Sequence, residues 1–498
     1  MSEMIPLPPE LREFISRTPA RSLLVHGPPG SGKTSLALAL LGEFPGRRIL
    51  VTTRVRTSRL LADFPWFREE VDAGRTLLVD GGPYPASARR TQAAIAHLKE
   101  LLVDPEHSPE TEWLWLPERV QEALAQVKHD QPTMLVIDSW NALIEGYLGG
   151  LTGALPTAPD RAEVERILLR SMTAADVALV LVVEHTAPSQ LDYLLDGVVA
   201  TGRRILDERT ERWLDIEKLR GVGILNPDYP YTLEGGRFHT FTTTNVSSGL
   251  QLPTPDPDPA PVEGSLWPGS LEHAAQFGRL PLGGLTTYLI DPGLSERWIR
   301  IMNVPLISHV LGEGGRIAHV PPPVISPDSI WRIYRGRVSP EAIQMQVRIQ
   351  LTGPSGHLPD PISRVTFPIS NDPKRPGTPQ SMALFNFLQE SANKGQVNVG
   401  IVWLAGLRGM AAASGVPYSP ESFPSVISAY TRIPRTHVVL VGEANDPLME
   451  SVRPMASTQI RVRTARGRVF VYGIQPATPL LLLCQGAPER PCRFAAIV

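Results

Sequence analysis

An eight-residue segment near the N-terminus limits what this chain can fold into more than any other feature. Residues 27–34 read Gly-Pro-Pro-Gly-Ser-Gly-Lys-Thr, which completes the pattern G-x-x-x-x-G-K-[ST]. An apolar run at 23–25 precedes the segment, and a helix-forming run at 35–41 follows it. Strand, glycine-rich loop and helix is the context in which this pattern binds phosphate. The sequence therefore predicts a phosphate-binding loop at 27–34.

The residue types of this loop explain how it would hold a nucleotide. Glycines permit positive φ, so successive backbone N–H groups can turn toward one anion, and the N-terminus of the next helix adds partial positive charge. We expect Lys33 to reach the β- and γ-phosphates. The predicted ATP-binding residues are Gly27, Pro28, Pro29, Gly30, Ser31, Gly32, Lys33, Thr34 and Ser35.

A second apolar run supplies the carboxylate that a magnesium nucleotide site requires. Residues 134–137 read Met-Leu-Val-Ile and are followed by Asp138. In nucleoside triphosphatases such a strand delivers its terminal carboxylate beside the phosphate loop, where the carboxylate holds Mg²⁺. We therefore predict Thr34 and Asp138 as metal ligands, with ATP and Mg²⁺ as cofactors.

The first half of the chain alternates short apolar runs with longer helical segments. The apolar runs at 48–52, 76–80, 133–137 and 178–183 read as buried strands, and residues 88–103 and 162–175 read as helices. Such alternation predicts an α/β domain with a mostly parallel sheet flanked by helices. Two later runs, 212–218 and 238–241, alternate apolar and polar residues and predict edge or antiparallel strands.

A proline-rich segment divides the chain almost in half. Residues 251–265 contain five prolines at alternate positions, which cannot lie inside a helix or a central strand. We predict a semi-extended linker there. The predicted domains are therefore residues 1–250 and residues 266–498, joined by the linker at 251–265.

Several short motifs resemble those of a known family. Ile137-Asp138-Ser139 resembles the RecA superfamily, and Lys218-Leu219-Arg220-Gly221 resembles the K-L-R-G motif of its KaiC branch. Residues 8–15 and Phe64-Pro65-Trp66 add a similarity to the phosphate-loop domain of the GvpD family of gas-vesicle regulatory proteins and its ATPase relatives. The resemblance covers residues 5–245. It implies a RecA-like ATP-binding domain.

The resemblance also implies that the protein assembles with itself. RecA and KaiC relatives bind ATP between neighbouring subunits, which implies that Lys218 and Arg220 reach the γ-phosphate of the next subunit's ATP. The two side chains share one face of a strand, because side chains alternate along it. A solvated edge strand is the alternative. The expected assembly is a homo-oligomeric ring, with a hexamer as one option.

One position departs from the pattern of these relatives. They carry a catalytic glutamate at the end of the strand that follows the phosphate-loop helix, but here residues 51–54 read Val-Thr-Thr-Arg. Glu184, which ends the strand after Asp138's strand, is the remaining candidate for polarising the attacking water. It could equally be a γ-phosphate sensor or a structural acid. The predicted catalytic residues are Lys33, Glu184, Lys218 and Arg220.

The second half of the chain reads as a faded copy of the first. Residues 287–290 mirror the strand that enters the phosphate loop, and 399–403 mirror the strand of Asp138. In this alignment Arg297 stands over Lys33, Trp298 over Thr34 and Trp403 over Asp138, while Glu296 replaces Gly32. A chance match of generic α/β units is the alternative. We predict two tandem RecA-like phosphate-loop domains, of which the second is degenerate and binds no triphosphate.

These observations lead to a functional prediction. We expect an oligomeric Mg-ATP-binding ATPase, an acid anhydride hydrolase, with a regulatory or signalling role and with slow or partner-stimulated hydrolysis. The alternatives are a nucleotide-gated scaffold without significant turnover and a DNA-acting recombinase or helicase. The first 250 residues carry 26 basic and 33 acidic side chains, which argues against nucleic acid without excluding it. The second domain could receive a protein partner.

Composition and the termini bound the remaining possibilities. Charged residues make up 20% of the chain and hydrophobic residues 42%, as in soluble globular proteins. The N-terminus lacks a basic, apolar leader, and no apolar run approaches the roughly 20 residues of a membrane span. We therefore expect a cytoplasmic protein. Cys484 and Cys492 are read as reduced thiols, with a disulfide as the alternative.

Overall fold

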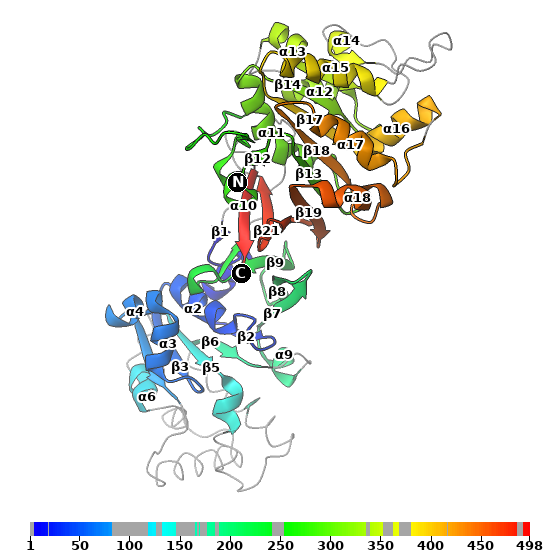
Figure 1. Cartoon of the computed structure of the whole chain (residues 1–498). Helices are drawn as coiled ribbons and strands as arrows, with labels where there is room; N and C mark the ends of the chain where they lie inside the picture. The colour runs from blue at the N-terminus through cyan, green and yellow to red at the C-terminus, as the bar shows by residue number, and fades with distance from the viewer. Residues whose placement is uncertain are drawn as a thin grey trace. The chain divides into compact units, whose positions relative to one another are not determined.

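The chain forms two compact units in the computed structural model. The structure describes residues 4–17, 19–81, 118–125, 132–145, 165–166, 169, 177–184, 189–241, 253–334, 339–351, 362–367, 380–415, 417–485 and 492–498. The first unit comprises Glu3–Thr242 together with Ile497–Val498, and the second comprises Thr243–Ala496. Each unit holds one large sheet with helices packed against it (Figure 1). The predicted α/β fold with two sheet-bearing domains is confirmed.

The first unit places the phosphate-loop strand in the middle of its sheet. Strand β2 (Ser22–His26) lies between β6 (Val177–Val182) and β7 (Gly197–Leu206) and runs parallel to both. The parallel part continues through β5 (Thr133–Asp138), β3 (Arg47–Thr52) and β4 (Thr76–Asp80). The carboxyl ends of these strands therefore meet at one edge of the sheet, where ligands of open α/β sheets bind.

Antiparallel strands extend this sheet on the other side of β7. They are β8 (Arg209–Leu219), β9 (Asp228–Thr232), β10 (His239–Phe241) and β1 (Met4–Ile5). The strands predicted at 212–218 and 238–241 from alternating polarity are thus confirmed as β8 and β10. The extension follows directly from the change in sequence pattern, because alternation marks strands with one buried face.

Helices cover both faces of the first sheet, because side chains alternate along each buried strand. Leu23 and Val25 pack into a core with apolar residues of α2 (Lys33–Glu43), whereas Leu24 faces a second core on the opposite side. Among the residues that the structure describes, the other helices are α1 (Pro9–Ile15), α3 (Thr57–Asp63), α4 (Pro65–Asp72), α6 (Glu118–Ala125) and α9 (Gln190–Leu194). The helix predicted at 88–103 and most of that at 162–175 lie outside the described residues.

The sheet of the second unit repeats the strand order of the first. Its order is β16-β15-β14-β17-β18-β13-β19-β20-β21-β22, which follows β4-β3-β5-β6-β2-β7-β8-β9 from β15 onward. The strands are β13 (Leu285–Ile290), β14 (Arg316–Val320), β15 (Val347–Gln350), β16 (Thr366–Phe367), β17 (Asn398–Trp403), β18 (Thr436–Glu443), β19 (Thr458–Ala465), β20 (Arg468–Gln475), β21 (Leu480–Gln485) and β22 (Cys492–Ile497). An identical order over eight strands supports a true internal repeat rather than a chance match.

The second unit also repeats the position of the first long helix. Helix α11 (Glu296–Gly312) follows β13 as α2 follows β2. The remaining elements are α10 (Leu271–Phe277), α12 (Pro327–Tyr334), α13 (Pro340–Gln346), α14 (Ile362–Val365), α15 (Gln380–Ala392), α16 (Leu404–Ser414), α17 (Phe423–Thr431) and α18 (Pro447–Val452), and the short strands β11 (Ser265–Leu266) and β12 (Leu280–Pro281). Cys484 and Cys492 are both buried and form no disulfide.

Part of the proline-rich segment is bound to the second unit. Arg279 donates to the carboxylate of Asp258 at 2.7 Å, and the indole N–H of Trp267 donates to the carbonyl of Asp256 at 2.8 Å. These contacts anchor residues that we predict as linker. In the part of the chain that the structure describes, every helix is too short or too polar to cross a membrane.

Candidate functional site

The predicted phosphate loop lies at the carboxyl edge of the first sheet, between β2 and α2. Gly27, Gly30 and Gly32 all have positive φ, at 144°, 72° and 86°. At Gly27 a side chain is excluded for two reasons. The positive φ disfavours it, and a Cβ there would lie 2.2 Å from the carbonyl oxygen of Thr201 on the neighbouring strand β7. The glycines of the motif therefore occupy the positions where the backbone requires glycine.

Lys33 is the first residue of α2, and its side chain folds back over the loop. Its Nζ donates hydrogen bonds of 2.9 Å to the carbonyl oxygens of Gly27 and Pro28. Burial lowers the pKa of Lys33, and the nearby carboxylates of Glu184 and Asp138 oppose that shift. The ammonium group thus stands inside the loop, with acidic side chains close by.

Thr34 and Asp138 come together as the sequence predicts for a metal site. The hydroxyl of Thr34 donates to Oδ2 of Asp138 at 2.6 Å, although the residues are 104 positions apart. Burial raises the pKa of Asp138, and the hydrogen bond from Thr34 and the charge of Lys33 oppose the shift. A hydroxyl and a carboxylate are oxygen ligands of the kind Mg²⁺ takes in such sites. The residues present therefore fit Mg²⁺ at this point.

Glu184 lies in the site and is paired with an arginine. It follows strand β6, and its Oε2 accepts from Nη1 of Arg54, which follows β3. The charges of both residues act on the pKa values of Lys33 and Asp138, which places them close to the loop. Arg54 belongs to the segment 51–54, where the resemblance predicts a glutamate and the sequence has none. We did not predict Arg54 as a site residue from the sequence. The missing carboxylate at 51–54 was the signal that could have identified it.

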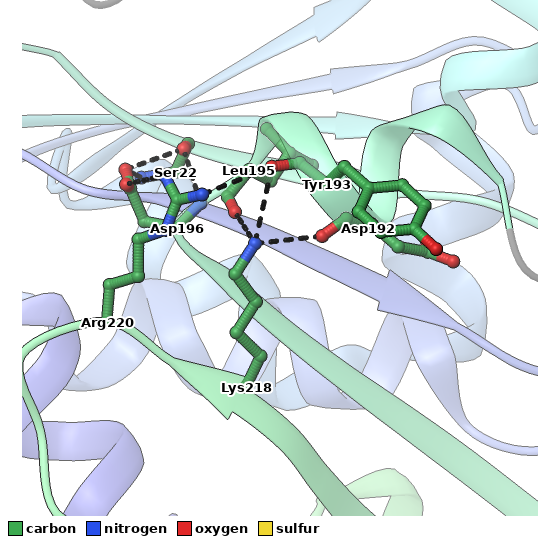
Figure 2. A network of polar contacts seen from close by, with 7 residues as sticks. All are labelled: Ser22, Asp192, Tyr193, Leu195, Asp196, Lys218 and Arg220. Atoms are coloured by element: carbon green, nitrogen blue, oxygen red, sulfur yellow. Dashed lines mark hydrogen bonds and ion pairs between the residues drawn. The ribbon is translucent and has the colours of Figure 1, made fainter.

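Lys218 and Arg220 belong to a network of polar contacts with residues 192–196 and Ser22 (Figure 2). The Nζ of Lys218 donates to the carbonyl oxygens of Asp192 at 2.9 Å and Leu195 at 2.6 Å, near the end of α9. Arg220 contacts Asp196 at 3.4 Å, and Asp196 accepts from the backbone N–H of Ser22, where β2 begins. The phosphate loop follows the other end of β2, about 13 Å away at roughly 3.3 Å per residue.

This placement bears on the expected role of the K-L-R-G residues. Within one chain they lie near the start of β2, whereas the phosphate loop follows the end of that strand. Burial, and next the charge of Arg220, lower the pKa of Lys218. Lys218 also has a structural role, because it satisfies carbonyl groups at the end of a short helix. The alternative of a purely solvated edge strand does not describe it.

Sequence reasoning missed three residues that hold the phosphate loop in place. The hydroxyls of Thr201 and Ser31 are 2.7 Å apart, the Tyr231 hydroxyl donates to the carbonyl oxygen of Ser31, and Arg212 donates to that of Gly30 at 3.0 Å. Burial raises the pKa of Tyr231 to about 12, so its hydroxyl remains a donor at neutral pH. These residues lie on β7, β8 and β9, and no local sequence signal says which strand pairs with β2.

The corresponding loop of the second unit is differently built. Five residues, Asp291–Ser295, separate β13 from α11, whereas six separate β2 from α2. Counting from the first helical residue therefore places Glu296, not Arg297, opposite Lys33. Asp291 is paired with Arg461 and accepts from the backbone N–H of Thr464 at 3.1 Å. In the second unit, the carboxylate of Glu296 therefore takes the position of Lys33, and the carboxylate of Asp291 lies in the loop that corresponds to the phosphate loop.

The positions of the metal ligands are also lost in the second unit. Trp403 ends β17 as Asp138 ends β5, and it is buried among apolar side chains. Glu296 forms an ion pair with Arg300 one helical turn away. Four arginines, Arg461, Arg463, Arg466 and Arg468, lie in the β19–β20 hairpin, whose strands pair from Gln459 with Gln475 to Ala465 with Arg468.

Comparison with known protein families identifies a P-loop domain in the part of the chain that contains the candidate site. Residues 11–217 match a family described as "GvpD gas vesicle protein, P-loop domain". This range begins in α1, contains the phosphate loop, Asp138 and Glu184, and ends within β8. It lies wholly within the first unit.

Curated relatives extend the similarity beyond that domain. Protein GvpD2 of Halobacterium salinarum is 28% identical over 342 residues, which is 64% of this chain and 62% of the relative. Protein GvpD1 of the same organism is 26% identical over 333 residues, which is 64% of this chain and 57% of the relative. The chain thus spans about three fifths of the length of these relatives.

Proposed function

We propose that this GvpD-like P-loop protein binds Mg²⁺-ATP at residues 27–35 and acts as a nucleotide-dependent regulatory protein of the gas-vesicle type. The observation that carries the proposal is the 2.6 Å contact between Thr34 and Asp138 beside the buried Lys33. Two oxygen ligands and one ammonium group, supplied by the start of α2 and the end of β5, converge on one loop of backbone amides. Thr34 and Asp138 would hold a bound Mg²⁺, which would neutralise phosphate charge.

We further propose that the active form is a homo-oligomer with ATP between subunits, and that hydrolysis is slow or stimulated by a partner. Support comes from Lys218 and Arg220, which lie at the sheet edge opposite their own loop. The degenerate second unit would then stabilise the assembly or receive a protein partner. The name of the relatives supplies the association with gas vesicles.

The assembly can be tested by measuring mass and turnover together. Light scattering should show a larger mass with Mg²⁺-ATP than without it. Arg220→Ala should lower turnover but leave ATP affinity unchanged, because the phosphate loop of the variant is intact. When Arg220→Ala subunits are mixed with Lys33→Ala subunits, part of the turnover should return, since intact loops then meet intact arginines. A monomer with and without nucleotide, or no recovery in the mixture, would contradict the interface model.

A nucleotide-gated scaffold without significant turnover is the second candidate, and one contact favours it. Glu184 accepts from Arg54, and a carboxylate held by a guanidinium is a weak base for the attacking water. Binding would then bias assembly without being followed by rapid hydrolysis. The RecA-type alternative of DNA strand exchange gains no comparable support from the described residues.

Substitutions at this ion pair should decide between an enzyme and a scaffold. If Glu184 activates water, Glu184→Gln should lower turnover at least about tenfold with ATP affinity nearly intact, and Arg54→Ala should raise turnover by releasing the carboxylate. A phosphate-release assay at saturating ATP measures the turnover of both variants. Arg59→Ala is the matched control, because Arg59 also pairs with an acid, Asp63, but on α3. An unchanged rate in Glu184→Gln would remove Glu184 from the mechanism.

A further inference from the structure

The hairpin of β7 and β8 carries two neighbouring cross-strand pairs of opposite character. Arg204 faces Glu211, forming an ion pair with a carboxylate that is fully buried. The preceding pair is Arg203 and Arg212, two positive charges directly across from each other. Opposite charges in such positions stabilise a sheet and like charges destabilise it. The second pair therefore needs an explanation that the first does not.

The like-charged pair lies against the phosphate loop. Strand β7 pairs with β2 up to His26 and Ala200, so residues 201–206 continue past the sheet edge beside the loop. The hydroxyl of Thr201 contacts that of Ser31, and Arg203 shares this face because side chains alternate with a period of two. A Cβ built on Gly30 would lie 3.6 Å from Nη1 of Arg203.

Arg212 approaches the same residue from the second strand. Its Nη1 donates to the carbonyl oxygen of Gly30 at 3.0 Å, and its Nε donates to a main-chain oxygen of Val498, the last residue of the sequence, at 2.8 Å. Arg212 is half-buried, whereas Arg203 is exposed. Two guanidinium groups thus approach the middle of the loop from the side opposite strands β5 and β6, where Asp138 and Glu184 lie.

We propose that Arg203 and Arg212 together bind the terminal phosphate of a nucleoside triphosphate held in the loop of their own chain. The proposal rests on the proposed function, namely that this loop binds Mg²⁺-ATP. An anion between the two guanidinium groups removes the repulsion of the pair, and the planar fork of arginine matches phosphate oxygens. Backbone amides of the loop and the start of α2 hold the inner phosphates. The added charges therefore act on the outermost one.

This arrangement gives the chain its own means of distinguishing ATP from ADP. Lys218 and Arg220 contact a nucleotide only after assembly, whereas Arg203 and Arg212 stand beside the loop in every subunit. Loss of the γ-phosphate would leave the two arginines facing each other without a phosphate between them. The pair would thus favour the triphosphate before any partner subunit binds.

Two nucleotides and a matched control test the proposal. Isothermal titration with Mg²⁺ should give a tenfold or larger weakening of AMP-PNP binding by Arg203→Ala, and less than a twofold change for ADP. Arg203→Lys should recover part of the loss. Arg209→Ala, near the turn of the same hairpin and on its other face, should alter neither affinity. Thermal unfolding of each variant confirms that the hairpin remains folded.

The outcomes separate this proposal from the one on which it rests. If wild-type protein binds neither AMP-PNP nor ADP, the proposed function fails. If wild type binds both and Arg203→Ala leaves the ratio of the two affinities unchanged, nucleotide binding stands and the arginine pair is excluded. Repeating the titration at a protein concentration where light scattering shows monomers establishes that the arginines act within one chain.

Discussion

Replacing Lys33 by alanine should weaken Mg²⁺-ATP binding by at least about 100-fold. Hydrogen bonds from a charged donor contribute roughly 1.5–3 kcal/mol each, and loss of two phosphate contacts therefore removes about 3 kcal/mol or more. The loop glycines keep their backbone geometry in the variant, so the fold should survive. The measurement is a titration with a fluorescent ATP analogue, accompanied by thermal unfolding of both proteins.

The pH dependence of this binding gives an independent check. Lysine attracts phosphate only when protonated, and burial lowers the pKa of Lys33. Wild-type affinity should therefore be complete at lower pH and fall as pH rises through this lowered pKa, below the pH at which an ordinary lysine titrates. The affinity of Lys33→Ala for ATP should lack this decrease at high pH. Equal affinities of variant and wild type at neutral pH would remove the loop from nucleotide binding.

The sequence predicted the parts of the fold that depend on local patterns. Runs of β-branched residues marked β3, β4, β5 and β6, because strands buried on both faces need continuous apolar sequence. The internal repeat was predicted from apolar segments of the second half that mirror strands of the first, and the common strand order of the two sheets supports it. The glycine loop was legible because its backbone conformation excludes other residues at fixed positions.

The rest of the site depends on which strands become neighbours, and that is a long-range property. Arg54 and Glu184 are 130 positions apart and meet only because β3 and β6 both flank β5. Arg203 and Arg212 reach the loop only because β7 pairs with β2 and extends past its end. The alignment of α11 with α2 in the structure is shifted by one residue from the alignment predicted from the sequence. The loop before α11 is one residue shorter than the phosphate loop, and such a shortening leaves the preceding strand unchanged.

Replacing Gly27 by alanine should strongly destabilise the first unit. The residue has φ of 144°, a region that side chains disfavour, and a Cβ would lie 2.2 Å from the carbonyl oxygen of Thr201. Left-handed strain alone costs about 1–3 kcal/mol, and relief of a backbone clash must displace β2 from β7. We expect a loss of more than about 3 kcal/mol in the free energy of unfolding, with nucleotide binding abolished.

Two other glycines separate the causes of that loss. Gly74 has φ of 68° and open space around it, so Gly74→Ala should cost only the conformational strain, about 1 kcal/mol. Gly42 lies in α2 without positive φ or close neighbours, so Gly42→Ala should stabilise the helix by about 0.5–1 kcal/mol. Urea denaturation ranks the three variants. If Gly27→Ala were no worse than Gly74→Ala, the close approach of Thr201 would not constrain the loop, and the contact between β7 and the nucleotide site would lose its support.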